Sequence, residues 1–211
     1  MGLKSRFAAG AHEHAAQFVR DGIRDGRWQP GETLEATALA TELGISASPV
    51  REAFARLRGE RLLEARHRGG YSIPMLQPHE LESEYRLMSL LAMSLATRPL
   101  EPQRVLRSSP TAYGERVDGL LMALARTADL PAAAGILHNS ALLLGPYLRA
   151  EPLFISHAEQ SVTEIEKLID AGDARALTSS IERHFERCIT AAPNLARYVF
   201  ERAKRFEKEF E

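Results

Sequence analysis

Three polar side chains mark the start of a short helix that the sequence predicts from about residue 46. Ser46 and Ser48 carry hydroxyls that can hydrogen-bond phosphates or base edges, and Arg51 can make a bidentate contact with guanine. Small Ala47 stands between the two serines. These residues occupy the first turns of the helix on its predicted solvent side, so they are candidates for contact with DNA.

The surrounding residues predict a helix-turn-helix. Apolar residues at helical spacing indicate helices over 8–26 and over 36–43, and Gly44 favours the end of the second. The third helix begins only two residues later, because Ser46 is a good N-cap and Pro49 is tolerated in a first turn. In this motif the second helix of the pair enters the major groove.

A hairpin follows the third helix. Short extended segments near 63–66 and 71–74 are joined by His67-Arg68-Gly69-Gly70, which predicts a β-hairpin with a basic tip. His67 and Arg68 can reach the DNA backbone or minor groove, and Gly69 lets the backbone approach closely.

The rest of the chain has a helical pattern. We expect helices near 78–98, 112–127, 130–149, 151–171, 174–190 and 193–210, with a proline-containing loop over 98–110. The predicted fold is therefore mainly α. It has a winged helix-turn-helix DNA-binding domain over residues 1–76 and an antiparallel six-helix bundle over residues 77–211.

Residues 10–76 resemble the GntR family of transcription regulators. The resemblance rests on IRDGRWQPGETLE (23–35), LATELGIS (39–46) and SPVREAF (48–54). It implies a homodimer on a short, roughly palindromic double-stranded DNA operator. Ala47 stands where the family usually has Arg, and Thr37 where some members have a basic residue. Arg51 and the hairpin are then expected to carry more of the base recognition.

The helical region resembles the FadR-type ligand-binding domain in its six-helix, VanR-like form. The resemblance rests on residues 81–96 and on 168–176 followed by a histidine at 184. It implies a small-molecule effector, and often a divalent metal on one Asp or Asn and three His. Two of those four ligand positions are occupied by Ala and Val. Many members also carry an Arg and a Glu where carboxylate effectors bind, and this chain has Met and Ala at those two positions. The corresponding effector-pocket candidates are Met88, Ala92, Ala134, His138, Val162 and His184.

With two metal ligands and the Arg missing, we expect no metal or other cofactor, and an apolar or neutral effector. Two other classes stay open. His184 and Cys188 lie one helical turn apart, so a thiol- or metal-dependent hydrolytic activity is the enzymatic alternative, although no catalytic motif is present. A purely structural or interaction role is the second alternative.

Composition limits the classes further. The formal net charge of -1 gives no overall basic signal, so DNA binding must rely on local charge. A single cysteine rules out an internal disulfide and fits a reducing compartment. No apolar run approaches the roughly 20 residues of a membrane span, and the first residues lack a secretion signal. We therefore expect a cytoplasmic, non-enzymatic regulator, most commonly a repressor in this family, with no membrane partner.

Overall fold

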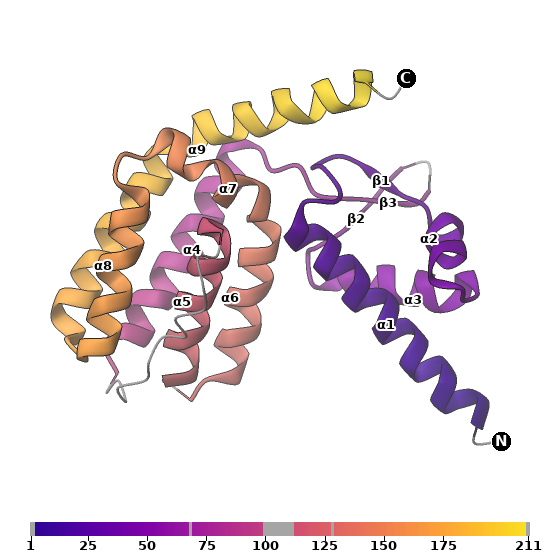
Figure 1. The fold of residues 1–211 in the computed structure, drawn as a ribbon, viewed down its shortest axis with the longest axis horizontal. Helices are drawn as coiled ribbons and strands as arrows, with labels where there is room; N and C mark the ends of the chain where they lie inside the picture. Colours follow the sequence, from indigo (N-terminus) through magenta and orange to yellow (C-terminus); the bar gives the residue numbers. More distant parts are fainter. Residues whose placement is uncertain (1–2, 68, 99–111, 128, 210–211) are drawn as a thin grey trace. The chain divides into compact units, whose positions relative to one another are not determined.

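The computed structural model describes residues 3–67, 69–98, 112–127 and 129–209 of the chain. It divides into two compact units, one comprising Met1–Met75 with Ala203–Glu211 and the other Leu76–Arg202. Both are mainly helical, and the first also holds a small antiparallel sheet, so the predicted fold class is confirmed (Figure 1).

The first unit is a helix-turn-helix with a three-stranded sheet. Its elements are α1 (Leu3–Asp25), β1 (Thr33–Leu34), α2 (Ala36–Leu43), α3 (Ala47–Gly59), β2 (Glu64–Ala65) and β3 (Tyr71–Ser72). Helices α1 and α2 both pack on α3. Strand β3 lies between β1 and β2, with Leu34 and Ala65 both paired with Tyr71. The apolar core of this unit includes Val19, Ile23, Leu34, Val50, Phe54, Leu57, Leu62 and Ile73.

The hairpin and both motif helices match the sequence prediction, whereas β1 was missed. Two extended residues give too little alternation for a strand to be recognised from sequence. Gly44 ends α2 at φ 66°, a left-handed conformation in which its N–H can reach the carbonyls of Ala40 and Thr41. This turn fixes the direction in which α3 leaves α2.

A close contact inside the first unit involves Gly22 on α1 and Trp28 in the following loop. A Cβ atom built on Gly22 would lie 2.2 Å from the Trp28 ring. The indole also packs edge-on against Phe18, with 6.2 Å between ring centroids. The missing side chain at residue 22 therefore makes room for the indole.

Gly22→Ala is expected to destabilise the first unit by about 1–3 kcal/mol, because the methyl group overpacks the Trp28 contact. Urea denaturation followed by circular dichroism measures this. The matched control is Gly10→Ala on the same helix, where no atom lies within 4 Å of the new Cβ. It should leave stability unchanged or raise it by up to about 1 kcal/mol. Equal effects of the two changes would contradict the steric explanation.

The second unit is built from α4 (Pro78–Ala96), α5 (Tyr113–Thr127), α6 (Pro131–Leu143), α7 (Gly145–Phe154), α8 (Ala158–Ala171) and α9 (Ala174–Glu209). Helix α5 packs against α4, α6, α7 and α8. Helix α8 runs beside the first part of α9 (Figure 1), where the Ser180 hydroxyl donates to Glu164. One apolar core joins residues from all six helices.

The predicted helix boundaries were wrong in two places. The expected helices 130–149 and 151–171 are three helices, because the chain breaks at Leu144, before Gly145-Pro146, and again at Ile155–His157. The expected helices 174–190 and 193–210 are one helix with Pro193 inside it. Pro193 is exposed, whereas Ala192, Leu195 and Ala196 are buried, so burial of the apolar face keeps the helix continuous.

None of the helices in the described part of the chain combines the length and the apolar character needed to cross a membrane.

Candidate nucleic-acid interface and buried polar cluster

The first turns of α3 form an exposed polar surface, which we call the recognition surface and define as Ser46, Ala47, Ser48 and Arg51. The serines and the arginine are exposed and Ala47 is half-buried. Ser46 is the N-cap residue in extended conformation, but its side chain makes no capping hydrogen bond. Its hydroxyl is therefore available to another partner.

Burial of the opposite face of α3 sets the direction of this surface. Val50, Phe54 and Leu57 are at most 1% exposed and pack into the core. Arg51 is consequently held on the solvent side, and no hydrogen bond or ion pair joins its guanidinium to any residue in the described ranges. Thr37 on α2 is also exposed, and its carbonyl accepts the Thr41 hydroxyl.

The β2–β3 hairpin is the wing of this domain, and the described residues include part of its tip. His67 and Gly69 are exposed, and Gly69 has φ 87°, a conformation that favours glycine. Arg68, the other predicted contact at this tip, lies outside the described residues. The neighbouring Arg66 side chain hydrogen-bonds to the Thr33 hydroxyl, which ties the base of the wing to β1.

An ionic network, missed at the sequence level, holds α1 against the C-terminal end of α3. Arg20 donates to both carboxylate oxygens of Glu60, at 2.8 and 2.7 Å from Nη2 and 3.2 Å from Nε. Glu13 pairs with Arg20 at 3.6 Å and also with Arg56. The Arg20 side chain is only 10% exposed, so its charge depends on these partners. Arg56 and Glu60 are a local i,i+4 pair, but their contacts with Glu13 and Arg20 join residues 40 and 43 positions apart, so no local pattern reveals the whole network.

Glu60→Gln is expected to lower the stability of the first unit by about 2–3 kcal/mol, because it leaves the Arg20 guanidinium nearly buried with a weaker partner. Chemical denaturation of the purified variant provides the measurement. Glu52→Gln on the exposed side of the same helix removes the same charge and should change stability by at most about 0.5 kcal/mol. A Glu60→Gln protein as stable as this control would show that the network contributes little.

The predicted effector-pocket residues have different environments. Met88, Ala92 and Val162 are at most 1% exposed and belong to the apolar core, and Ala134 is half-buried against it. His138 is half-buried on α6, with Nδ1 3.2 Å from a carboxylate oxygen of Asp118. Their role in effector binding stays a prediction.

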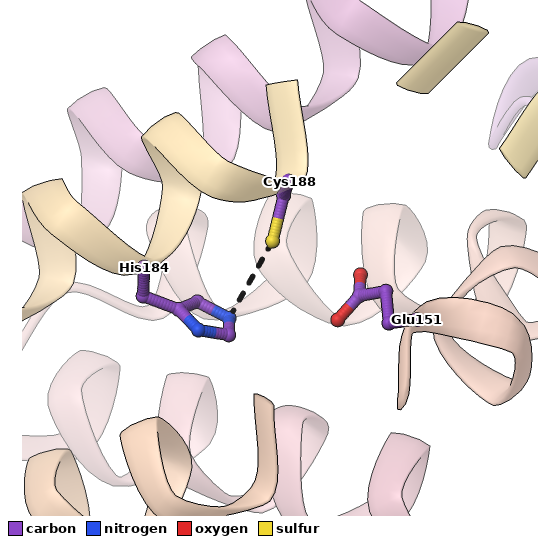
Figure 2. Close-up of side chains that lie close together, drawn as sticks. All are labelled: Glu151, His184 and Cys188. Atoms are coloured by element: carbon purple, nitrogen blue, oxygen red, sulfur yellow. Dashed lines mark hydrogen bonds between the residues drawn. The ribbon is translucent and has the colours of Figure 1, made fainter. Parts of the chain in front are cut away.

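His184 belongs to a group that we call the buried polar cluster: Tyr85, Tyr113, Glu151, His184 and Cys188. Glu151 on α7 is 0% exposed and accepts hydrogen bonds of 2.7 Å from the hydroxyls of Tyr85 and Tyr113. Nε2 of His184 lies 3.7 Å from Sγ of Cys188, one turn further along α9. Figure 2 shows the Glu151 carboxylate pointing towards this pair.

Burial controls the protonation of this cluster. Removal from water raises the pKa of Glu151 to about 7, and the two tyrosine hydroxyls oppose this rise. It lowers the pKa of His184 to about 4, with a contribution from the positive charge of Arg187. It also raises the pKa of the Cys188 thiol well above its ordinary value, and the Glu151 charge adds to this. In the protein alone, thiol and imidazole are therefore uncharged near neutral pH.

The sequence analysis identified His184 and Cys188 but missed Glu151, Tyr85 and Tyr113. Glu151 lies between Ala150 and Pro152 in a short helix, where nothing local distinguishes it from an exposed acid. The metal pattern of the FadR type does not fit this structure. The residues at two of its positions, Ala134 and Val162, carry no ligand atom, and His138 pairs with Asp118.

Comparison with known proteins identifies the first unit. Residues 11–73 match the family described as bacterial regulatory proteins, gntR family. The HTH-type transcriptional regulator YdhC of Bacillus subtilis is 38% identical over 65 residues, which are 31% of this chain and 29% of that protein. The chain spans little more than half, or less, of the length of the curated relatives it matches.

Solved structures extend the likeness to the helical unit. McbR/YncC of E. coli aligns with a TM-score of 0.64 and 18% identity, covering 86% of this chain and 96% of that one. A transcriptional regulator GntR from Rhodococcus sp. RHA1 aligns with a TM-score of 0.71 at the same identity and coverage. At such identity the likeness establishes the fold alone.

The first unit is thus a winged helix-turn-helix domain, the class of fold that places one helix in a DNA groove. This domain belongs to the GntR family of bacterial regulatory proteins. The second unit has a helical fold like that of McbR/YncC.

Proposed function

We propose that this chain is a sequence-specific DNA-binding transcription regulator, acting as a repressor, whose operator affinity is modulated by a small-molecule effector. It would act in the cytoplasm as a homodimer on a roughly palindromic operator, since the two-fold symmetry of a dimer matches two half-sites. The observation that carries the proposal is the recognition surface on a GntR-family helix-turn-helix. Its serine and arginine side chains are exposed, and the hydroxyl of the N-cap residue Ser46 makes no capping hydrogen bond.

The chemistry of the recognition surface supports base reading. A guanidinium held on the solvent side can bond both O6 and N7 of guanine, and serine hydroxyls can position the protein on phosphates. Ala47 offers only a methyl group, which suits apolar contact with a thymine methyl rather than a hydrogen bond. Arg51 is therefore the main candidate for direct readout.

The helical unit supports an effector role. The buried polar cluster in its interior holds a carboxylate, two phenols, an imidazole and a thiol, which is more polar chemistry than a bundle needs for folding alone. An effector that binds one arrangement of the protein more tightly would shift operator affinity by that difference, typically about 1–3 kcal/mol.

The enzymatic alternative is weakened by the state of Cys188. A cysteine nucleophile needs an accessible thiolate with a lowered pKa. Cys188 is 0% exposed, and its burial raises the pKa of the thiol.

Arg51→Ala should weaken binding to the specific operator by about 1–3 kcal/mol for each half-site, roughly 5- to 150-fold per half-site, because each subunit of the dimer loses one bidentate base contact. The operator is first isolated by sequencing the DNA fragments that the protein retains. Fluorescence anisotropy titration at fixed salt then measures the affinity, and analytical ultracentrifugation gives the oligomeric state.

Arg175→Ala is the matched control, because it removes the same charge from an exposed position on α9. It should bind the operator as the unchanged protein does. Operator affinity that is the same for both variants would refute the role of Arg51, and binding without sequence preference would refute the regulator itself.

A further inference from the structure

We propose that Glu151, His184 and Cys188 form a binding site for a divalent metal ion of the zinc class inside the helical unit. This site goes beyond the DNA-binding function and shares only His184 with the metal pattern of the FadR type. It departs from the sequence-based expectation of no metal, which considered that pattern alone.

The geometry suits a tetrahedral ion. One ligand atom from each of the three residues lies within 4.8 Å of the others, and all three residues are buried. Sγ of Cys188 and Nε2 of His184 are 3.7 Å apart. Zinc–sulfur and zinc–nitrogen bonds of about 2.3 and 2.0 Å at a tetrahedral angle separate the two ligand atoms by about 3.5 Å. A carboxylate oxygen of Glu151 is the third ligand atom within this limit.

The electrostatics also favour a cation. Glu151 is 0% exposed, and within the described residues it has no ion-pair partner. A buried carboxylate without a positive partner is unfavourable, and two tyrosine hydroxyls offset only part of that cost. A divalent ion bound here would pair with the carboxylate and with the thiolate that forms when Cys188 gives its proton to solvent.

The imidazole provides an independent indication. Nδ1 of His184 is buried and, in the described part of the chain, has no hydrogen-bond partner. Such unpaired polar atoms are rare in protein interiors and point to a partner that the chain itself does not supply. With Nε2 bound to the ion, the ring proton is on Nδ1, and a water molecule outside the ion's own ligand shell would accept it.

Tyr85 and Tyr113 would act as positioning residues. Each donates a 2.7 Å hydrogen bond to a different oxygen of Glu151, which holds the carboxylate in one orientation towards the pair on α9 (Figure 2). Metal sites depend on such outer hydrogen bonds for affinity. Three protein ligands leave a fourth position open, as in zinc sites that bind a small molecule.

The test uses the full chain, produced without a polyhistidine tag, freed of metal with a chelator and titrated with Co²⁺. We expect a sulfur-to-cobalt charge-transfer absorption that saturates at one Co²⁺ per chain and disappears on addition of Zn²⁺. Because Cys188 is the only cysteine in the sequence, this absorption identifies the site without any variant.

Variants then separate this site from other histidines. Cys188→Ser should abolish the charge-transfer absorption, and Tyr113→Phe should weaken Co²⁺ binding about 10- to 100-fold. His138→Asn is the matched control, because it removes a histidine at a family ligand position outside the cluster, and it should bind Co²⁺ normally. Circular dichroism shows whether each variant folds. If Cys188→Ser does not fold, the charge-transfer absorption of the unchanged protein with Co²⁺ decides whether Cys188 is a ligand.

Co²⁺ binding without the charge-transfer absorption would show that the metal lies elsewhere and would overturn the inference. Loss of Co²⁺ binding in His138→Asn would overturn it for the same reason. Failure of the metal-free protein to take up Co²⁺ or Zn²⁺ would overturn it as well. None of these outcomes depends on DNA binding, so the proposed regulator function stands or falls separately.

Discussion

The burial of one face of α3 governs everything that the first unit can present to a partner. Val50, Phe54 and Leu57 fill the space between α3 and the helices that pack on it, so α3 cannot rotate about its axis without exposing them. At roughly 1.5–3 kcal/mol for each buried side chain, this constraint is strong relative to the stability of a small domain. The Arg20–Glu60 pair adds a directional bond at the end of α3 distant from the recognition surface. Packing and ion pairing together fix the orientation of α3, so the Arg51 side chain stays on the solvent-exposed face.

The helix-turn-helix could be predicted from sequence because its determinants are local. Gly44, Ser46 and Pro49 each favour one backbone conformation within a few residues, and the apolar spacing fixes which faces are buried. The same reasoning failed for β1, which is only two residues long, and at Pro193, where tertiary burial outweighs the local preference of proline. The division into six helices was correct in number but misplaced around Leu144.

The buried polar cluster could not be predicted for a different reason. Its members come from α4, α5, α7 and α9, so only the three-dimensional packing of the bundle brings them together. His184 and Cys188 were recognisable as neighbours because a helical turn separates them. Glu151 and its two tyrosines required knowledge of which side of each helix faces inward. The ionic network on α1 and α3 escaped prediction on the same grounds.

The distribution of aromatic side chains gives each unit its own optical signal. Trp28 is the only tryptophan in the chain, and it packs against Phe18 beneath the Arg27 guanidinium in the first unit. Tyr85, Tyr113 and Tyr147 are all buried in the second unit, where rigid packing gives phenol rings near-ultraviolet circular dichroism. Tryptophan fluorescence therefore reports on the DNA-binding domain, and most of the tyrosine dichroism reports on the helical domain, since Tyr71 in β3 is the tyrosine of the first unit. The melting of the two halves can be followed separately in one unlabelled sample.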